Sequence, residues 1–318
     1  MKAMILNEAR RLTWAEVPEP VRKADEVLID VHAAAVNRAD LMQVDGHYQS
    51  PPEWPQWCGL EVSGIVLEAP ANAAVQPGDQ VCALVGGGGY SSRIAVPAGM
   101  VIPIPAGISL ADAAAIPEVW STVYLNVQLE AGGLRPGDVF FVQAGASGIG
   151  LAAIQFAKLY GAQVITTVST PDKANAARRA GADIVINYRT EDVSAVLEAH
   201  PVNVALDCIG GPALGTYLRN LAFGGRWIMI ASMGGAETQI NVETLWRKRL
   251  RLIGNTLRSR TAEEKSRIMH ALQQELWPLF SAGKLQVNVG AHFPVAEVEK
   301  AHALLRTSAS IGKVVLTF

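Results

Sequence analysis

Hydrophobic residues in the first third of the chain come in short runs separated by glycine and proline. Four such runs, EVLIDVHAAAV, VSGIVLEAP, GDQVCALV and SSRIAVP, lie between residues 26 and 97. Apolar and β-branched residues bounded by turn residues are typical of strands. We therefore predict a compact, mostly antiparallel β module up to about residue 115, followed by a helical stretch, AAAIPEVWSTVYLNVQLE.

The pattern changes at about residue 138, where apolar runs begin to alternate with helical segments. The predicted strands are VFFVQA, QVITTV, DIVINY, NVALDCI, RWIMIAS and RLIGNTL. The segments IGLAAIQFAKLYG and PDKANAARRAGA contain helices that stop at glycine. This alternation predicts an α/β fold with a doubly wound parallel sheet, and six strands complete a dinucleotide-binding fold. The tail, residues 287–318, returns to strand, helix and strand, and we expect it to rejoin the first module.

Composition narrows the range of partners. Half of the 318 residues are hydrophobic and 18% are charged. The net charge of −2 does not indicate binding to nucleic acid or to an anionic membrane. Cys58, Cys82 and Cys208 lie far apart and form no CxxC pair, which suits a reducing compartment. We find no long apolar segment at the N-terminus and no run that resembles a membrane span. We expect a soluble, cytoplasmic protein that acts on a small molecule.

The turn AGASGIG, residues 144–150, lies between the first strand of the second part and its helix. Glycines at such a turn allow close approach of a pyrophosphate and tight packing of helix on strand. Ser147 stands where the second fingerprint glycine normally lies, and it can offer its N–H and hydroxyl to a phosphate at the helix N-terminus. We expect Gly145, Ser147, Gly148 and Ile149 to bind a dinucleotide. Alternatively, the glycines only pack the helix against the strand.

The end of the next strand indicates which dinucleotide binds. An NAD site has Asp or Glu there to hold the ribose hydroxyls, whereas this chain has Val168-Ser169-Thr170, with Lys173 shortly after. Hydroxyls and an ammonium group attract the 2′-phosphate of NADP, which a carboxylate would repel. We predict NADPH, bound through Ser169, Lys173 and Tyr188. Alternatively, Lys173 is only an exposed lysine at the start of a helix.

Several motifs carry a resemblance to a known family: NRADLMQ, GLEVSGIV, AAAIPEVWST, AGASGIG, DCIGG, LRSR and IGKVVL, in this order over nearly the whole chain. The sequence resembles the zinc-free quinone oxidoreductase (zeta-crystallin-like) branch of the medium-chain dehydrogenase/reductase superfamily. The resemblance implies a GroES-like catalytic domain from residues 1–119 and 258–318, a Rossmann domain over 120–257, and an active-site cleft between them. It also implies a homodimer built through the edge of the sixth strand.

Zinc-dependent members of this superfamily place Cys and Gly-His-Glu where this chain has Asn37 and Gly59-Leu60-Glu61. A catalytic zinc requires three protein ligands such as Cys or His, so we predict no metal. Polarising an ordinary carbonyl is difficult without a Lewis acid. Quinones and conjugated enones, which accept hydride unaided, are therefore the expected substrates.

The resemblance also assigns roles to individual residues. Asn37 and Tyr48 would lie beside the nicotinamide and the substrate as catalytic residues, with Tyr48 able to stack or to donate a proton. Alternatively, Tyr48 is a half-buried loop aromatic, with Trp54 and Trp57 either rimming the site or packing beneath the loop. Asp40 and Glu61 would be structural partners of Arg38 or of backbone amides. Further cofactor contacts are assigned to Thr122, Met233, Gly234, Leu257, Arg258, Ser259 and Lys313. Lys313 is equally well explained as a surface lysine.

The function expected from the sequence is NADPH-dependent reduction of quinones without a metal. Two alternatives stay open: an alkenal or enone double-bond reductase that uses the same cofactor, and a non-catalytic, crystallin-like NADPH-binding protein. The residues do not distinguish one-electron from two-electron transfer.

Overall fold

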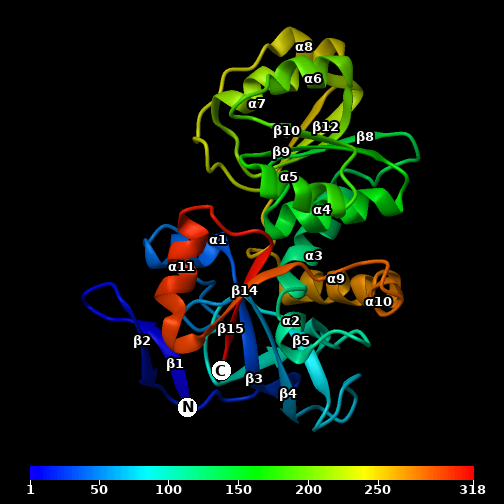
Figure 1. Ribbon diagram of the computed structural model, residues 1–318. Helices are drawn as coiled ribbons and strands as arrows, with labels where there is room; N and C mark the ends of the chain where they lie inside the picture. Colours follow the sequence, from blue (N-terminus) through cyan, green and yellow to red (C-terminus); the bar gives the residue numbers. More distant parts are fainter. The chain divides into compact units, whose positions relative to one another are not determined.

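The computed structural model describes residues 1–318 and divides into two compact units (Figure 1). Unit 1 contains Met1–Ser121 and Leu257–Phe318, and unit 2 contains Thr122–Thr256. No helix is both long and apolar enough to cross a membrane.

Unit 1 is built on a seven-stranded sheet with the order β14-β15-β3-β4-β5-β7, in which β6 also pairs with β3. Its strands are β3 (Glu26–Val36), β4 (Glu61–Glu68), β5 (Gln80–Leu84), β6 (Arg93–Pro97), β7 (Val101–Pro103), β14 (Val289–Pro294) and β15 (Lys313–Thr317). The last strand, β15, runs antiparallel to β3, with Val314 opposite Val36. The tail of the chain therefore lies in the same sheet as its beginning. A separate antiparallel pair, β1 (Lys2–Leu6) and β2 (Leu12–Glu16), was not among the predicted strands.

The centre of this sheet is packed with small residues. Ala33 and Ala35 of β3 lie in one buried cluster with Ala114, Ala115 and Val315. These short side chains allow α2 (Leu110–Ala113) to approach the strand closely. The other helical segments that begin in unit 1 are α1 (Arg38–Val44), η1 (Ala98–Met100), α3 (Pro117–Val123), α9 (Ala262–Glu275), α10 (Trp277–Ser281), η3 (Val295–Glu297) and α11 (Val298–Arg306).

Unit 2 is a parallel six-stranded sheet with the order β10-β9-β8-β11-β12-β13. Its strands are β8 (Val139–Val142), β9 (Gln163–Val168), β10 (Ile184–Asn187), β11 (Val202–Asp207), β12 (Leu221–Met229) and β13 (Arg251–Gly254). Counted along the chain, this order is the 3-2-1-4-5-6 arrangement of the Rossmann fold. The predicted doubly wound sheet is confirmed.

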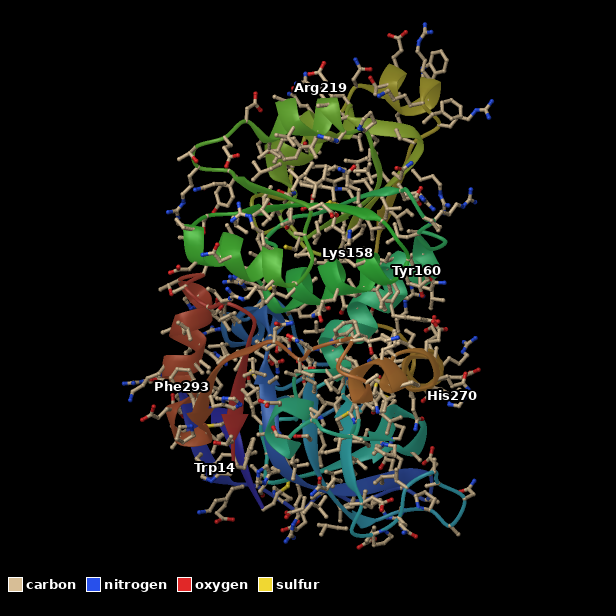
Figure 2. All side chains as sticks on the ribbon, turned by 45° about the vertical axis from the view of Figure 1, so that its right-hand side comes forward. Trp14, Lys158, Tyr160, Arg219, His270 and Phe293 are labelled. Atoms are coloured by element: carbon tan, nitrogen blue, oxygen red, sulfur yellow. The ribbon has the colours of Figure 1, made fainter.

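Helices cover both faces of this sheet, α4 and α5 on one face and α6, α7 and α8 on the other (Figure 1). Their bounds are α4 (Gly148–Leu159), α5 (Pro171–Arg179), α6 (Val193–Ala199), α7 (Gly211–Leu218) and α8 (Val242–Arg247), and η2 (Tyr124–Glu130) precedes them. Because both faces are covered, the strands are almost continuously apolar. Phe140, Phe141 and Trp227 are fully buried. In Figure 2, carbon-rich side chains fill the space between the sheet and its helices, while Arg219 points to the outside.

Candidate active site

The turn from β8 into α4 lies at the carboxyl edge of the parallel sheet, where open α/β sheets bind their ligands. Ser147 caps the helix, because its Oγ accepts a hydrogen bond of 3.0 Å from Gly150 N. Its own N–H donates to Ala144 O at 2.9 Å. This N–H is thus used inside the turn, and a phosphate contact by Ser147 stays a prediction. The hydroxyl proton and the first amides of α4, those of Gly148 and Ile149, are the donors that the turn presents.

Close packing explains two glycines of this turn. A Cβ atom on Gly145 would lie 2.1 Å from Thr166 Oγ1 on β9, and one on Gly150 would lie 2.4 Å from Ala144 O. Neither position has room for a side chain. The packing role that the sequence left as an alternative is therefore present, and a phosphate contact by Gly145 remains a prediction.

The end of β9 collects hydroxyl groups and one ammonium group. Lys173 Nζ lies 3.3 Å from Ser169 Oγ, and Thr170 caps α5 by accepting from Lys173 N at 3.4 Å. Tyr188 follows β10, and its N–H donates to Val168 O, the last residue of β9, at 3.1 Å. The structure thus brings Ser169, Lys173 and Tyr188 to one edge of the sheet. Ser169 and Lys173 are partly buried and Tyr188 is 53% exposed.

A buried carboxylate that the sequence did not single out shapes the neighbouring turn. Asp207, at the end of β11, accepts hydrogen bonds from Gln143 Nε2, from Trp227 Nε1 and from the amides of Ile209 and Gly210. Burial raises the pKa of Asp207, and these hydrogen bonds act in the opposite direction. The carboxylate therefore holds the DCIGG segment in place.

Met233 and Gly234, both predicted to contact the cofactor, are bound to the DCIGG segment through their backbone amides. Gly234 N donates to Ile209 O and Met233 N donates to Cys208 O, while the Met233 side chain is 48% exposed. Elsewhere, Thr122 is buried, and its backbone oxygen accepts from Asn126 Nδ2 at 2.7 Å. Contacts of Thr122, Met233 and Gly234 with a cofactor stay predictions.

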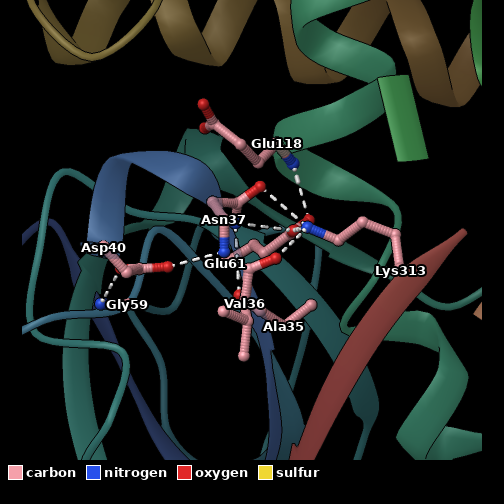
Figure 3. A network of polar contacts seen from close by, with 8 residues as sticks. All are labelled: Ala35, Val36, Asn37, Asp40, Gly59, Glu61, Glu118 and Lys313. Carbon is pink, nitrogen blue, oxygen red and sulfur yellow. Dashed lines mark hydrogen bonds and ion pairs between the residues drawn. The ribbon is translucent and has the colours of Figure 1, made fainter. Parts of the chain in front are cut away.

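Unit 1 contains a buried polar cluster around the ammonium group of Lys313 (Figure 3). Lys313 Nζ lies 2.7 Å from Glu61 Oε1, 2.7 Å from Asn37 Oδ1 and 2.8 Å from Val36 O. An ammonium group has three donors, so these contacts use all of them. The side chain of Lys313 is 7% exposed, and the interpretation of Lys313 as a surface lysine is therefore wrong. A cofactor contact by Lys313 stays a prediction and would have to replace one of these hydrogen bonds.

The side chain of Asn37 forms three hydrogen bonds in this cluster. Its Nδ2 donates to Glu61 Oε1 at 3.0 Å and to Ala35 O at 3.2 Å, while its Oδ1 accepts from Lys313. Both amide hydrogens are therefore used within the protein. The carbonyl oxygen keeps one lone pair for another donor. This arrangement fixes the orientation of Asn37, and its predicted catalytic role is not tested by it.

Asp40 and Glu61 are structural partners of backbone amides. Asp40 accepts from Asn37 N at 2.7 Å and from Gly59 N at 2.8 Å, and Glu61 accepts from Glu118 N at 2.8 Å. Arg38, the other suggested partner, contacts Ser308 Oγ. Burial raises the pKa of Asp40, and its two amide hydrogen bonds oppose the shift.

Tyr48 is positioned by Arg258. The guanidinium group of Arg258 is buried and donates to Tyr48 O, Gly86 O, Gln43 Oε1 and Ser50 Oγ. It also lies over the ring of Tyr48, 4.9 Å from its centroid. The Tyr48 side chain is partly buried, and its hydroxyl has no hydrogen-bond partner in the chain. Arg258 thus fixes the loop that carries Tyr48.

The neighbouring positions are accounted for by packing. Trp54 is buried against Gly86, and Trp57 Nε1 donates to Gly88 O at 2.9 Å. Trp54 therefore packs beneath the loop, whereas Trp57 is only partly buried. Leu257 is buried, and its contact with a cofactor and that of Ser259 stay predictions.

A second buried lysine, Lys265, was missed by the sequence reasoning. It is 2% exposed, and its Nζ donates to Arg258 O at 2.8 Å. Lys265 lies on α9, a helix that was not among the predicted helices. The chain holds no cluster of three or more His, Cys, Asp or Glu side chains with the geometry of a metal site.

Comparisons with known proteins agree with this architecture. The family model of the alcohol dehydrogenase GroES-like domain matches residues 23–106, and that of zinc-binding dehydrogenases matches residues 148–274. Quinone oxidoreductase-like protein 2 of Bos taurus is 30% identical, over 99% of this chain and 92% of that protein.

Solved structures give the same result. A quinone oxidoreductase of Thermus thermophilus, also determined in complex with NADPH, is 31% identical with a TM-score of 0.86, and the match covers 100% of both chains. An NAD-dependent alcohol dehydrogenase is 27% identical with a TM-score of 0.87, again over 100% of both chains. The chain is thus an oxidoreductase, and it belongs to the quinone oxidoreductase branch of the medium-chain dehydrogenase/reductase superfamily.

Proposed function

We propose that this protein reduces quinones with NADPH and does so without a metal ion. The observation that carries the proposal is the end of β9, where Ser169 Oγ and Lys173 Nζ lie 3.3 Å apart in place of the carboxylate of an NAD site. Support also comes from the Thermus thermophilus relative, whose structure was determined in complex with NADPH.

The carboxyl edge of unit 2 fits NADPH. Ser169, Lys173 and Tyr188 would hold the 2′-phosphate, because a hydroxyl and an ammonium group both favour its negative charge. The amides of Gly148 and Ile149 and the hydroxyl of Ser147 would hold the pyrophosphate at the start of α4. When bound, NADPH supplies the hydride from its nicotinamide ring.

The polar cluster of unit 1 supports a reaction without zinc. Two positions that supply zinc ligands in zinc-dependent relatives carry Asn37 and Leu60 in this chain, and neither side chain is a usual zinc ligand. The oxygens of Asn37 and Glu61 already bind the ammonium group of Lys313. A quinone suits such a site because it accepts hydride without a Lewis acid.

Tyr48 is the side chain that would supply a proton to the reduced acceptor. Its hydroxyl is not used by the protein, and the loop that carries it is fixed by Arg258. Donation of a proton to a developing oxyanion is a usual task for tyrosine. The same hydroxyl favours the second candidate function, reduction of a conjugated double bond, in which the proton goes to carbon.

An acceptor screen at saturating NADPH, followed by the loss of NADPH absorbance, tests the proposal. We expect oxidation of NADPH with quinones and a slower reaction in Tyr48→Phe. If enones react faster than quinones, and deuterium from labelled NADPH stays on the product carbon, the protein is a double-bond reductase. Tight NADPH binding with no oxidation by any acceptor would identify a non-catalytic binding protein and overturn the proposal.

A further inference from the structure

Helix α1 lies between the two residues that are predicted to be catalytic. Asn37 is the N-cap of α1, and Tyr48 follows shortly after its last residue, Val44. The start of the helix is held by Asp40, whose carboxylate accepts a hydrogen bond from Asn37 N at 2.7 Å. The placement of Tyr48 relative to Asn37 therefore depends on how the C-terminal end of α1 is held.

The C-terminal end of α1 closes in a tight turn. Gly46 N donates to Gln43 O at 3.0 Å, and His47 N donates to Met42 O at 2.8 Å. Gly46 has a φ angle of +85°, which residues with a side chain rarely adopt. These two hydrogen bonds around a left-handed glycine form a Schellman motif. The motif fixes the direction in which the chain leaves α1 towards Tyr48.

Two arginines from distant segments bind this end of the helix. The last turn of α1 has no basic residue and its C-cap is the acidic Asp45, although the C-terminus of a helix already carries partial negative charge. Arg306 of α11 donates to Asp45 twice, from Nη1 to Oδ2 at 2.8 Å and from Nη2 to Oδ1 at 3.0 Å. Arg10, between β1 and β2, donates from Nη2 to Val44 O at 2.7 Å. The two arginines thus stabilise an end of α1 that its own residues leave unfavourable.

The ion pair of Asp45 and Arg306 joins α1 to α11, which lie in contact (Figure 1). Two parallel hydrogen bonds are the most specific arrangement of an arginine with a carboxylate. Hydrogen bonds from Arg306 lower the pKa of Asp45, and burial acts in the opposite direction. The side chains of Arg306 and Asp45 are 50% and 40% exposed, and such pairs add little to the free energy of unfolding. Their main effect is on the orientation of the segment that they bind.

We propose that Arg306 is a positioning residue that, through Asp45, fixes the end of α1 and so directs Tyr48 towards the substrate. Arg258 binds Tyr48 O at 2.9 Å, so the chain has one fixed point before the phenol and a second at its own carbonyl group. The direction of the Tyr48 side chain relative to Asn37 is then defined. This inference rests on the proposed function and deepens it, because it names the group that orients the proposed proton donor.

Steady-state kinetics with an uncharged quinone at saturating NADPH test this role. Arg306→Ala should lower kcat by about 5-fold, which corresponds to about 1 kcal/mol, the upper end for an exposed ion pair. Arg306→Lys keeps the charge but not the paired hydrogen bonds, and it should recover part of the loss. In a Tyr48→Phe background, Arg306→Ala should cause no further loss, because the hydroxyl group that it positions is absent.

Arg11→Ala is the matched control. Arg11 forms two hydrogen bonds with Glu299 of α11, from Nε at 3.2 Å and from Nη2 at 2.7 Å. This pair joins the β1–β2 turn to the same helix as Arg306 and forms no hydrogen bond with residues 44–48. We therefore expect Arg11→Ala to leave kcat unchanged. An equal loss in Arg11→Ala and Arg306→Ala would show that a loosened α11 is the cause, and it would overturn the positioning role.

A measurement that does not need turnover separates this inference from the proposed function. Amide hydrogen exchange of the unliganded protein reports on the hydrogen bonds of Gly46 N and His47 N, because an amide exchanges when its hydrogen bond opens. Arg306→Ala should speed the exchange of these two amides by a similar factor of about 5. Arg11→Ala should leave it unchanged.

A wild type that reduces quinones with a kcat that Arg306→Ala does not change, or lowers equally in the Tyr48→Phe background, overturns the role of Arg306 and leaves the proposed function intact. A wild type that reduces no acceptor overturns the proposed function. In that case, faster exchange of Gly46 and His47 in Arg306→Ala, but not in Arg11→Ala, still supports the positioning of the turn by Arg306. Unchanged exchange in both variants would overturn that as well.

Discussion

Lys313 Nζ lies 2.7 Å from Glu61 Oε1, and the two side chains are only 7% and 0% exposed. Lys313 begins the last strand of the chain and Glu61 begins β4, so the ion pair joins the two chain segments of unit 1, Met1–Ser121 and Leu257–Phe318. Both charges have further partners, Asn37 and Val36 O for Lys313 and Glu118 N for Glu61. A buried pair tolerates the loss of water only when its hydrogen bonds are satisfied in this way.

We expect Lys313→Met to lower the free energy of unfolding by about 3–5 kcal/mol, because it leaves the Glu61 carboxylate buried without its counter-ion. Adding Glu61→Gln should recover part of this loss, since no uncompensated charge then remains. Chemical denaturation measures both changes. Arg247→Met breaks an exposed ion pair with Glu243 and should cost no more than about 1 kcal/mol. Equal losses for Lys313→Met and Arg247→Met would show that the buried ion pair contributes no more to the free energy of unfolding than the exposed one.

Lys173→Ala should weaken NADPH binding by roughly 1.5–3 kcal/mol, the scale for a hydrogen bond to a charged group. NADH, which lacks the 2′-phosphate, should bind this variant as it binds the wild type. Calorimetric titration with both nucleotides measures the difference. Arg178→Ala removes the same charge from the opposite end of α5 and serves as the control. A similar loss with both variants would indicate only long-range attraction.

Gly145→Ala should destabilise the protein by roughly 1–3 kcal/mol, the usual cost of overpacking, because the new methyl group would lie 2.1 Å from Thr166 Oγ1. Combined with Thr166→Ala, it should cost less than the sum of the two single changes. Thermal unfolding compares the four proteins of this cycle. Gly254→Ala, where a Cβ meets no atom within 4 Å, is the control. Strict additivity of Gly145→Ala and Thr166→Ala would contradict the packing role of this glycine.

His302 should make the protein sensitive to mild acid. Burial and the charge of Arg306 lower the pKa of His302 to about 4 from 6.5, while Asp45 and Glu299 oppose the shift. Between these values the unfolded chain binds a proton that the folded chain does not, so stability falls as the pH decreases from 6.5 towards 4. The shift corresponds to a loss of about 3 kcal/mol.

His302→Gln can still accept a hydrogen bond from the Tyr90 hydroxyl, which contacts His302 Nε2 at 3.3 Å in the wild type, but it cannot be protonated. Denaturation at pH 7 and at pH 4 should therefore show a smaller change in this variant than in the wild type. His270→Gln, an exposed change on α9, is the matched control. An identical loss of stability in His302→Gln and in the wild type between pH 7 and pH 4 would show that His302 does not cause the acid sensitivity.

Much of the fold follows from patterns that are local in the sequence. The change in hydrophobic period near residue 138 and the turn around Gly145 predict the parallel sheet of unit 2. The capping box of Thr261 and Glu264, which starts α9, is also a local signal, because a Thr followed three residues later by Glu is typical of a helix N-terminus. The β1–β2 pair was not predicted because its two strands are only five residues long.

The site was less accessible to sequence reasoning because its contacts join distant segments. Nothing near Lys313 in the sequence indicates that its ammonium group contacts Glu61, since that contact depends on β15 pairing with β3 and on β3 pairing with β4. In the same way, the LRSR motif predicted a role for Arg258 but not that its side chain would hold the Tyr48 loop. The use of the Ser147 N–H inside its own turn depends on backbone geometry, which residue types alone do not specify.

Steady-state oxidation of NADPH and of NADH by the best quinone, at one ionic strength, tests the central claim most directly. We expect kcat/KM to be at least about ten-fold higher with NADPH, which corresponds to about 1.4 kcal/mol for the contacts of Ser169 and Lys173 with the 2′-phosphate. Equal or higher values with NADH, or no oxidation of either nucleotide, would contradict the account.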